Sequence, residues 1–356
     1  MLFNLCYLSK SEGTGGKIRK NPWDFIVTEI DLNGEKYYID KKVGPKWTKK
    51  EDYVVFVLQK RNWTTIQALR EITKRLSFGK KRISCAGAKD RKATTVQLAS
   101  IFRTEPERIM KIEIKDINIL GAWYWDVPVK MGDLLGNAFE IKVPSVEEDC
   151  TTVNRIYEEL NGVFPNYFGE QRFGIEKNNH IIGKYILKGE FEEAVIEYIT
   201  KEKRKQNDKC INEIETDMRN HNFGKVLEKI PKYLKYERTI LNHLLYKRND
   251  YVGALRKLPR SVLLMFVHSV QSYLFNILLH QKLEEAEPRN KINIEEGEYL
   301  CGKNWYGFPE INRIDGTFPV GKLIGYSSKP NKREKEILDI EGLSVENFKI
   351  KSIPEI

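Results

Sequence analysis

The sequence has few cysteines and histidines, and their placement excludes several kinds of chemistry. The five cysteines lie far apart and form no Cys-x-x-Cys pair: Cys6, Cys85, Cys150, Cys210 and Cys301. This spacing argues against a zinc site or a disulfide framework and is typical of a reduced, cytoplasmic protein. All five histidines fall in the second half: His180, His221, His243, His268 and His280. The first half therefore has no imidazole for Ser-His or Cys-His catalysis.

Signatures of membranes and of nucleotide cofactors are also missing. No apolar run approaches the ~18 residues of a membrane span, and the first seven residues are too short for a signal-peptide core, so we expect no membrane partner. Residues 13–17 hint at a phosphate-binding loop, but Ser11 stands where that loop needs glycine and Ile18 where it needs Ser or Thr. No Rossmann fingerprint is present either. A flexible turn is the better interpretation of residues 13–17.

Positive charge and aromatic side chains are abundant. The formal net charge is +10 over 356 residues, and the chain contains 17 Tyr, 16 Phe and 6 Trp. A basic protein suits a partner that carries phosphates, and aromatic rings stack on unpaired bases, although they also fill protein cores. The composition therefore favours a nucleic-acid partner.

Hydrophobic periodicity indicates two regions. The first half alternates strand-like and helix-like segments, which predicts an α+β fold with a mixed or antiparallel sheet. Strands are predicted at 23–30, 53–60, 82–85, 95–102, 124–129 and 137–143, and helices at 64–76, 105–110 and 149–160. In the first of these helices Ile66, Leu69, Ile72 and Leu76 share one face. A mostly helical pattern follows to about residue 282, and short strands return at 294–326. We place a domain boundary at 176, giving domains 1–176 and 177–356.

One acidic residue, Asp90, stands alone in a basic loop between two apolar strands. From 80 to 92 every other charged side chain is a cation: Lys80, Lys81, Arg82, Lys89, Arg91 and Lys92. A carboxylate among cations stays ionised, so it can act as a nucleophile or a base, while the cations attract a polyanion. An exposed ion pair with Arg91 is the simpler alternative. The neighbouring Gly87, Thr94, Thr95 and Gln97, which leave room and offer donors, favour a site.

A second motif lies at 164–174, where aromatics, amides and glycines are crowded together. Asn166 and Phe168 are two residues apart, so an extended segment projects both to the same side. An aromatic face and an amide are what a pocket for an extruded base requires. An aromatic turn that closes the domain core is the alternative, and it is favoured for Tyr167 and Phe173.

These strings together resemble the TruD family of pseudouridine synthases, and most closely its archaeal members. The resemblance rests on GAKDRKATTVQ at 87–97 and NYFGEQRFG at 166–174, with NPWDFIVTE at 21–29, GNAF at 136–139 and QSYLFN at 271–276 in support. It implies a pseudouridine-synthase catalytic domain at 1–176 and a mainly helical α/β insertion domain at 177–356. The family's C-terminal return to the catalytic domain, with its Gly-Ser-Tyr-Ala-Thr-like stretch, is not found before Ile356.

The resemblance also implies roles for single residues. Asp90 would attack the target uridine, Arg19 would be its basic partner, Phe168 and Asn166 would line the active site, and Phe25 would stack. The residues expected to contact RNA or substrate besides Phe25 are Lys60, Lys89, Arg91, Lys92, Gln97 and Arg172. The four catalytic residues are expected to converge in a basic cleft between the two domains.

The implied reaction isomerises a uridine, usually at position 13 of tRNA, to pseudouridine. It involves no redox change and no energy input, so no cofactor or metal is implied, and no protein partner. Asp90 could attack either the base or the sugar. A non-catalytic RNA-binding or tRNA-chaperone protein remains the alternative, because the same basic and aromatic surface would serve it. A nuclease is a weaker alternative, because clustered carboxylates for two metals are not evident.

Overall fold

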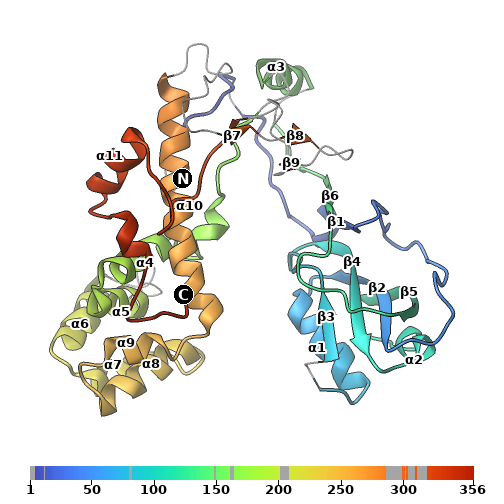
Figure 1. Ribbon diagram of the computed structural model, residues 1–356, viewed down its shortest axis with the longest axis horizontal. Helices are drawn as coiled ribbons and strands as arrows, with labels where there is room; N and C mark the ends of the chain where they lie inside the picture. The colour runs from blue at the N-terminus through green and yellow to red at the C-terminus, as the bar shows by residue number, and fades with distance from the viewer. Residues whose placement is uncertain are drawn as a thin grey trace. The chain divides into compact units, whose positions relative to one another are not determined.

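A computed structural model describes residues 5–11, 13–79, 82–147, 150–160, 164–200, 208–285, 299–300, 302–303, 309–310 and 319–356. The chain divides into two compact units (Figure 1). The sheet unit comprises Ser11–Ile156 with Lys303–Pro309. The helical unit comprises Met1–Lys10, Tyr157–Gly302 and Glu310–Ile356. The units thus divide before residue 176, and the assignment of catalytic and insertion domains to 1–176 and 177–356 stays a prediction.

The sheet unit is built on a mixed sheet. Its elements in chain order are η1 (Pro22–Asp24), β1 (Phe25–Ile30), β2 (Tyr53–Arg61), α1 (Thr65–Arg75), β3 (Ile83–Cys85), β4 (Thr94–Phe102), α2 (Pro106–Met110), β5 (Ile117–Trp125) and β6 (Gly136–Ile141). The strands lie in the order β5-β2-β4-β1-β6, and β3 also pairs with β4. The pairing of β1 with β4 is parallel, whereas the other described pairs of this sheet are antiparallel.

The inner strand β2 is apolar on both faces from residue 54 to 58 because both faces are covered there. Val54, Phe56 and Leu58 belong to a buried cluster with residues of α1, whereas Val55 and Val57 pack on the opposite side of the sheet. Side chains alternate between the faces of a strand, so a strand buried on both sides is continuously apolar. Helix α1 begins after Thr64, whose hydroxyl accepts a hydrogen bond from the Gln67 N–H at 3.2 Å.

Two details of the predicted elements are wrong. Ile66 does not share the buried face of α1, since its side chain is 58% exposed. The strand predicted at 124–129 is β5, which begins at Ile117 and ends at Trp125. Gly121 interrupts its apolar pattern because the Val43 carbonyl approaches there: a Cβ at position 121 would lie 2.3 Å from that oxygen.

The helical unit consists of short helices around one long helix. Its elements are η3 (Glu170–Phe173), α4 (Asn179–Lys188), α5 (Phe191–Thr200), α6 (Asp208–Arg219), α7 (Phe223–Lys229), α8 (Lys235–Tyr246), α9 (Tyr251–Leu255), α10 (Arg260–Glu285), α11 (Lys332–Ile340) and η5 (Val345–Phe348). Helix α3 (Cys150–Leu160) crosses the division between the units. The short strands are β7 (Tyr299–Leu300), β8 (Gly302–Lys303), β9 (Pro309–Glu310) and β10 (Pro319–Val320); β7 pairs with β10 and β8 with β9. Most of 294–326 lies outside the described residues.

Helix α10 is the core of this unit (Figure 1). Phe266, Val270 and Leu274 are buried in its hydrophobic cluster, and Gly183 of α4 allows close approach to the Phe266 carbonyl. Among the described residues, α10 is also the helix long and apolar enough to cross a membrane, which corrects the expectation that no such run exists. Its burial against the surrounding helices accounts for that apolar composition.

Candidate active site

The Asp90 loop connects β3 with β4, and β3 and β1 pair with opposite ends of β4. Strand β3 pairs antiparallel with residues 99–101 of β4, so the chain from 86 to 93 must continue in the direction of β3 to reach the start of β4 at Thr94. The start of β4 pairs in parallel with β1. This topology sets the loop beside β1 and the residues that precede it, and Phe25 and Val27 of β1 pack against Ala93.

Arg19 and Asp90 form an ion pair in this loop region. The Arg19 Nη2 lies 3.2 Å from the Asp90 Oδ2, and about a third of each side chain is exposed. The Arg19 backbone is left-handed, with φ of 60°. Its guanidinium lies over the Phe25 ring, with Cζ 4.1 Å from the ring centroid. A cation over an aromatic face is attracted to it, so Phe25 orients Arg19 toward Asp90.

The role expected of Phe25 is therefore wrong. Its side chain is only 5% exposed. Arg19 covers one side of the ring, and Phe139 of β6 meets it edge to face at 6.0 Å between centroids. A ring enclosed in this way supports the arginine and offers no free face to a uridine.

Lys60, expected to contact RNA phosphates, is instead buried beneath the loop. Its side chain is 0% exposed, and its Nζ donates to the carbonyl oxygens of Asp90 at 2.8 Å and Lys89 at 3.4 Å. Burial lowers the pKa of Lys60 to about 8, although the nearby Asp90 carboxylate opposes this change. A fully buried amine cannot reach a phosphate, so Lys60 holds the backbone of the loop.

Gln97 is likewise buried and structural. Its Nε2 donates to the Gly87 carbonyl at 2.9 Å, and its Oε1 accepts from the Thr65 hydroxyl at 3.0 Å. The same Thr65 oxygen accepts from the backbone N–H of Lys89 at 2.9 Å. Thr65 was not among the site residues predicted from the sequence. Its position at the first turn of α1, opposite β4, is visible only once the sheet has formed.

Lys89 does not face solvent either. Its Nζ lies 2.6 Å from the Glu29 Oε2, and the two side chains are 4% and 0% exposed. The other Glu29 oxygen accepts from the Leu98 N–H at 3.0 Å. Burial raises the pKa of Glu29, and the Lys89 ammonium partly offsets this effect. Lys89 thus ties the loop to β1. By contrast, Arg91 and Lys92 are exposed, so the predicted phosphate contacts of these two residues stand as predictions.

The second motif lies in the helical unit, where Asn276 of α10 holds it. The Asn276 Oδ1 accepts from the Phe168 N–H at 2.8 Å, and its Nδ2 donates to the Phe168 carbonyl at 3.0 Å. The half-buried Phe168 ring meets Phe275 edge to face at 5.4 Å, and the Arg172 guanidinium lies 5.3 Å from its centroid. Asn166 is exposed. The convergence of Asn166 and Phe168 with Arg19 and Asp90 stays a prediction.

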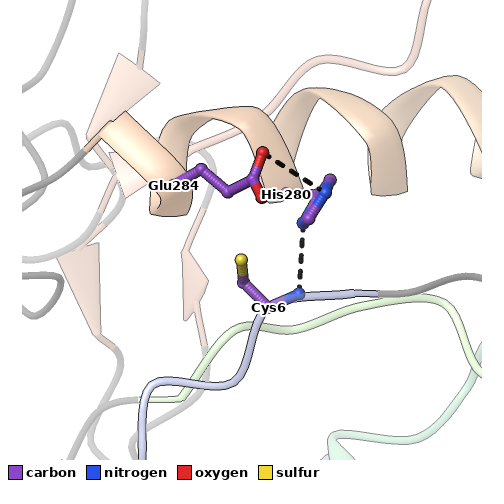
Figure 2. A group of neighbouring side chains, drawn as sticks. All are labelled: Cys6, His280 and Glu284. Atoms are coloured by element: carbon purple, nitrogen blue, oxygen red, sulfur yellow. Dashed lines mark hydrogen bonds and ion pairs between the residues drawn. The ribbon is translucent and has the colours of Figure 1, made fainter.

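A separate group of potential metal ligands occurs in the helical unit (Figure 2). Cys6, His280 and Glu284 bring their ligand atoms within 4.8 Å of one another. The His280 Nδ1 accepts from the Cys6 backbone N–H at 3.1 Å, and its Nε2 lies 3.5 Å from the Glu284 Oε2. A metal-bound histidine normally donates its other N–H to an acceptor. Here that other nitrogen faces a donor, so the arrangement is that of a hydrogen-bonded clamp on residue 6.

Comparison with known proteins gives consistent matches. A family model described as tRNA pseudouridine synthase D (TruD) matches residues 3–356. Two relatives, each named "Probable tRNA pseudouridine synthase D", come from Pyrococcus abyssi and Thermococcus onnurineus. The Pyrococcus relative is 34% identical to this chain, and the match covers 98% of this chain and 87% of the relative. The Thermococcus relative is 35% identical, and the match covers 96% of this chain and 84% of the relative. A crystal structure of a Methanosarcina mazei tRNA pseudouridine synthase D aligns with a TM-score of 0.73 and 31% identity, covering 98% of this chain and 84% of that one.

Proposed function

Since the chain belongs to the TruD family of tRNA pseudouridine synthases, we propose that it isomerises the uridine at position 13 of tRNA with the Asp90 carboxylate as nucleophile. The motif-based resemblance and the α+β fold class are confirmed by the family match and by the solved relative. The residue roles and the target nucleotide are our inference. A tRNA-modifying role also suits a cytoplasmic protein.

The ion pair between Arg19 and Asp90 is the observation that carries the proposal. A carboxylate held at 3.2 Å from a guanidinium, still about a third exposed, is both oriented and accessible. The backbone on either side of it is fixed by Lys60 and by the chain of hydrogen bonds through Thr65 and Gln97. Orientation of a reacting group by rigid neighbours is what lowers the barrier of a positioned reaction.

The reaction needs only a nucleophile and a means of turning the base. The bond from the ribose C1′ to N1 breaks, and a bond from C1′ to C5 forms. C5 loses its proton to solvent and N1 gains one, so substrate and product are isomers and no electrons are exchanged with a co-reactant. The uridine must leave its stack to reach Asp90, which costs a few kcal/mol. We propose that Phe168 and Asn166 receive the turned base.

The test compares Asp90→Asn with the wild-type protein on an unmodified tRNA transcript labelled with tritium at C5 of uridine. Wild type is expected to release tritium from one nucleotide, which chemical mapping of pseudouridine should place at position 13 of the tRNA. Asp90→Asn should release none while binding the transcript as well or better, because an amide lacks a nucleophilic oxygen and a negative charge is removed. Normal turnover by Asp90→Asn would refute the nucleophile assignment.

Asp52→Asn serves as the matched control. Asp52 is exposed beside the opposite end of β2 from Lys60, roughly 25 Å away along the strand. The same chemical change there should leave turnover unaltered. If wild type binds tRNA and converts no uridine, the non-catalytic RNA-binding alternative is favoured instead.

A further inference from the structure

A hollow in the sheet unit opens next to the Asp90 loop. It has a volume of about 670 Å³ and lies along the outer side of α1. Its lining residues are Asn62, Trp63, Gln67, Arg70, Glu71, Thr73, Lys74, Phe78 and Arg91. Lys60, Thr65 and Gln97, whose side chains hold the backbone around Asp90, are not part of this lining.

The charges around the hollow favour an anion. Arg70, Lys74 and Arg91 contribute three cations, and Glu71 is the one acid in the lining. Glu71 is itself 3.6 Å from Arg75, one turn further along α1. Arg70 and Lys74 are exposed and four residues apart, so both project from the same face of the helix. A concave surface with a net positive lining attracts phosphate.

The remaining lining matches the other parts of a nucleotide. The Trp63 indole N–H donates to the Lys115 carbonyl at 3.2 Å, which fixes the plane of a half-buried ring. Aromatic rings stack on bases, and amide side chains such as those of Asn62 and Gln67 bond to base edges. Phe78 carries the Arg82 guanidinium at 3.9 Å from its centroid, so it adds positive charge beside the hollow.

Two chain connections link the hollow to the reacting carboxylate. Arg91 lines the hollow and directly follows Asp90. Asn62 also lines the hollow. It comes two residues after Lys60, which holds the Asp90 carbonyl, and its backbone N–H donates to the Ala93 carbonyl in the same loop at 3.1 Å. The hollow is therefore lined in part by the loop that carries Asp90.

We propose that this hollow is a second nucleotide subsite, which holds a nucleotide adjoining the target uridine in the same RNA strand. The proposal rests on the proposed function for the identity of the RNA. Trp63 stacks on the base of that nucleotide, and Arg70, Lys74 and Arg91 hold its phosphates. Such a subsite holds the RNA strand at one nucleotide while the base of the neighbouring uridine turns.

The first experiment measures the dissociation constant of the protein for tRNA transcripts in which the nucleotide 5′ or 3′ of uridine 13 lacks its base. With wild type, one of these changes should weaken binding by about tenfold, the scale of one lost base–aromatic stack. With Trp63→Leu, the same change should cost nothing further, because the stacking partner is already gone. Equal losses in both proteins, for both neighbours, would overturn the subsite.

The second experiment avoids any effect of Trp63 on folding. Arg70→Gln and Lys74→Gln alter exposed side chains of α1, and each should reduce the slope of log affinity against log salt concentration by about 0.7–0.9. Lys111→Gln removes an exposed charge of the same unit outside the hollow and should leave the slope unchanged. Unaltered slopes in the two α1 variants would also overturn the proposal.

Both readouts are affinities and do not depend on turnover. If wild type converts no uridine but the stacking and salt effects appear, the proposed function fails and the subsite stands. If wild type converts uridine and neither effect appears, the subsite fails and the proposed function stands.

Discussion

Replacing Lys60 with Met is the most informative perturbation of the loop, because two opposing energies are removed together. The folded protein buries the ammonium and lowers its pKa from 10.5 to about 8. At about 1.4 kcal/mol for each pKa unit, charged Lys60 therefore costs about 3 kcal/mol at neutral pH. Methionine removes that cost, but the carbonyls of Asp90 and Lys89 then lose their donor, at about 1–3 kcal/mol for an unsatisfied group. At pH 7 we therefore expect stabilities within about 2 kcal/mol.

The pH dependence separates the two energies. Below pH 8 both the folded and unfolded states carry protonated Lys60, so the cost is fully present. Between pH 8 and 10.5 the unfolded state binds more protons, so wild-type stability rises with pH relative to Lys60→Met. Denaturant unfolding at pH 7 and pH 10 should show a relative gain of about 2–3 kcal/mol for wild type. Parallel stability curves for the two proteins would refute the assignment of a buried, charged Lys60.

Turnover of Lys60→Met supplies the functional half of the prediction. Misplacement of a reacting group by about 1 Å can cost 10²-fold in rate, so kcat should fall at least tenfold. KM for tRNA should not change, because the buried amine touches no phosphate. Lys92→Met is the matched control: it removes an exposed lysine of the same loop and should raise KM with little change in kcat. If Lys60→Met instead has a raised KM and a normal kcat, the result would show that Lys60 contacts a phosphate of the RNA, as first expected.

Two further predictions concern the second motif and the buried ion pair. Phe168→Ala should weaken handling of the turned uridine by about 1–3 kcal/mol in kcat/KM, with tRNA and short RNA alike; a loss of thermal stability with unchanged kinetics would show that the ring only packs against Phe275. Glu29→Ala should destabilise the protein by about 3–5 kcal/mol, because it leaves Lys89 charged and unpaired inside the sheet unit. Glu29→Ala with Lys89→Met should recover most of that loss in denaturant unfolding, and failure to recover would contradict the ion-pair account.

Much of the fold could be predicted from the sequence because its strands are strongly patterned. Residues 53–58 of β2 are apolar without interruption, and the predicted bounds of β2 and β4 differ from the observed ones by a single residue at one end. Strand β5 was partly missed because Gly121 interrupts its apolar pattern. The glycine is needed where the Val43 carbonyl comes close to the strand, and this contact is not visible in the local sequence. The membrane-length stretch of α10 was overlooked because isolated polar residues break up its apolar run, although its mean hydropathy is high.

The site was predicted unevenly, and burial explains the difference. The pairing of Arg19 with Asp90 was expected from the family resemblance and is present. Lys60, Lys89 and Gln97 were assigned to RNA because a sequence displays their charge and polarity and conceals their exposure. Their burial depends on the course of residues 86–93 along β4, which is a property of strand order. The parallel contact of β1 with β4 joins residues distant in sequence, so periodicity alone could not place Glu29 beside Lys89.

The pair formed by Lys89 and Glu29 also constrains how this sequence can diverge. Loss of either partner leaves an unpaired charge in the buried interior, which destabilises the protein by about 3–5 kcal/mol. This is a large part of the free energy of unfolding of a typical protein, about 5–15 kcal/mol. If one of the two positions changes first, the single variant is poorly folded, unless earlier substitutions have already raised the stability of the protein. The two positions, sixty residues apart along the chain, are therefore inherited as one unit. Neither can change alone, although the structure buries both side chains away from solvent.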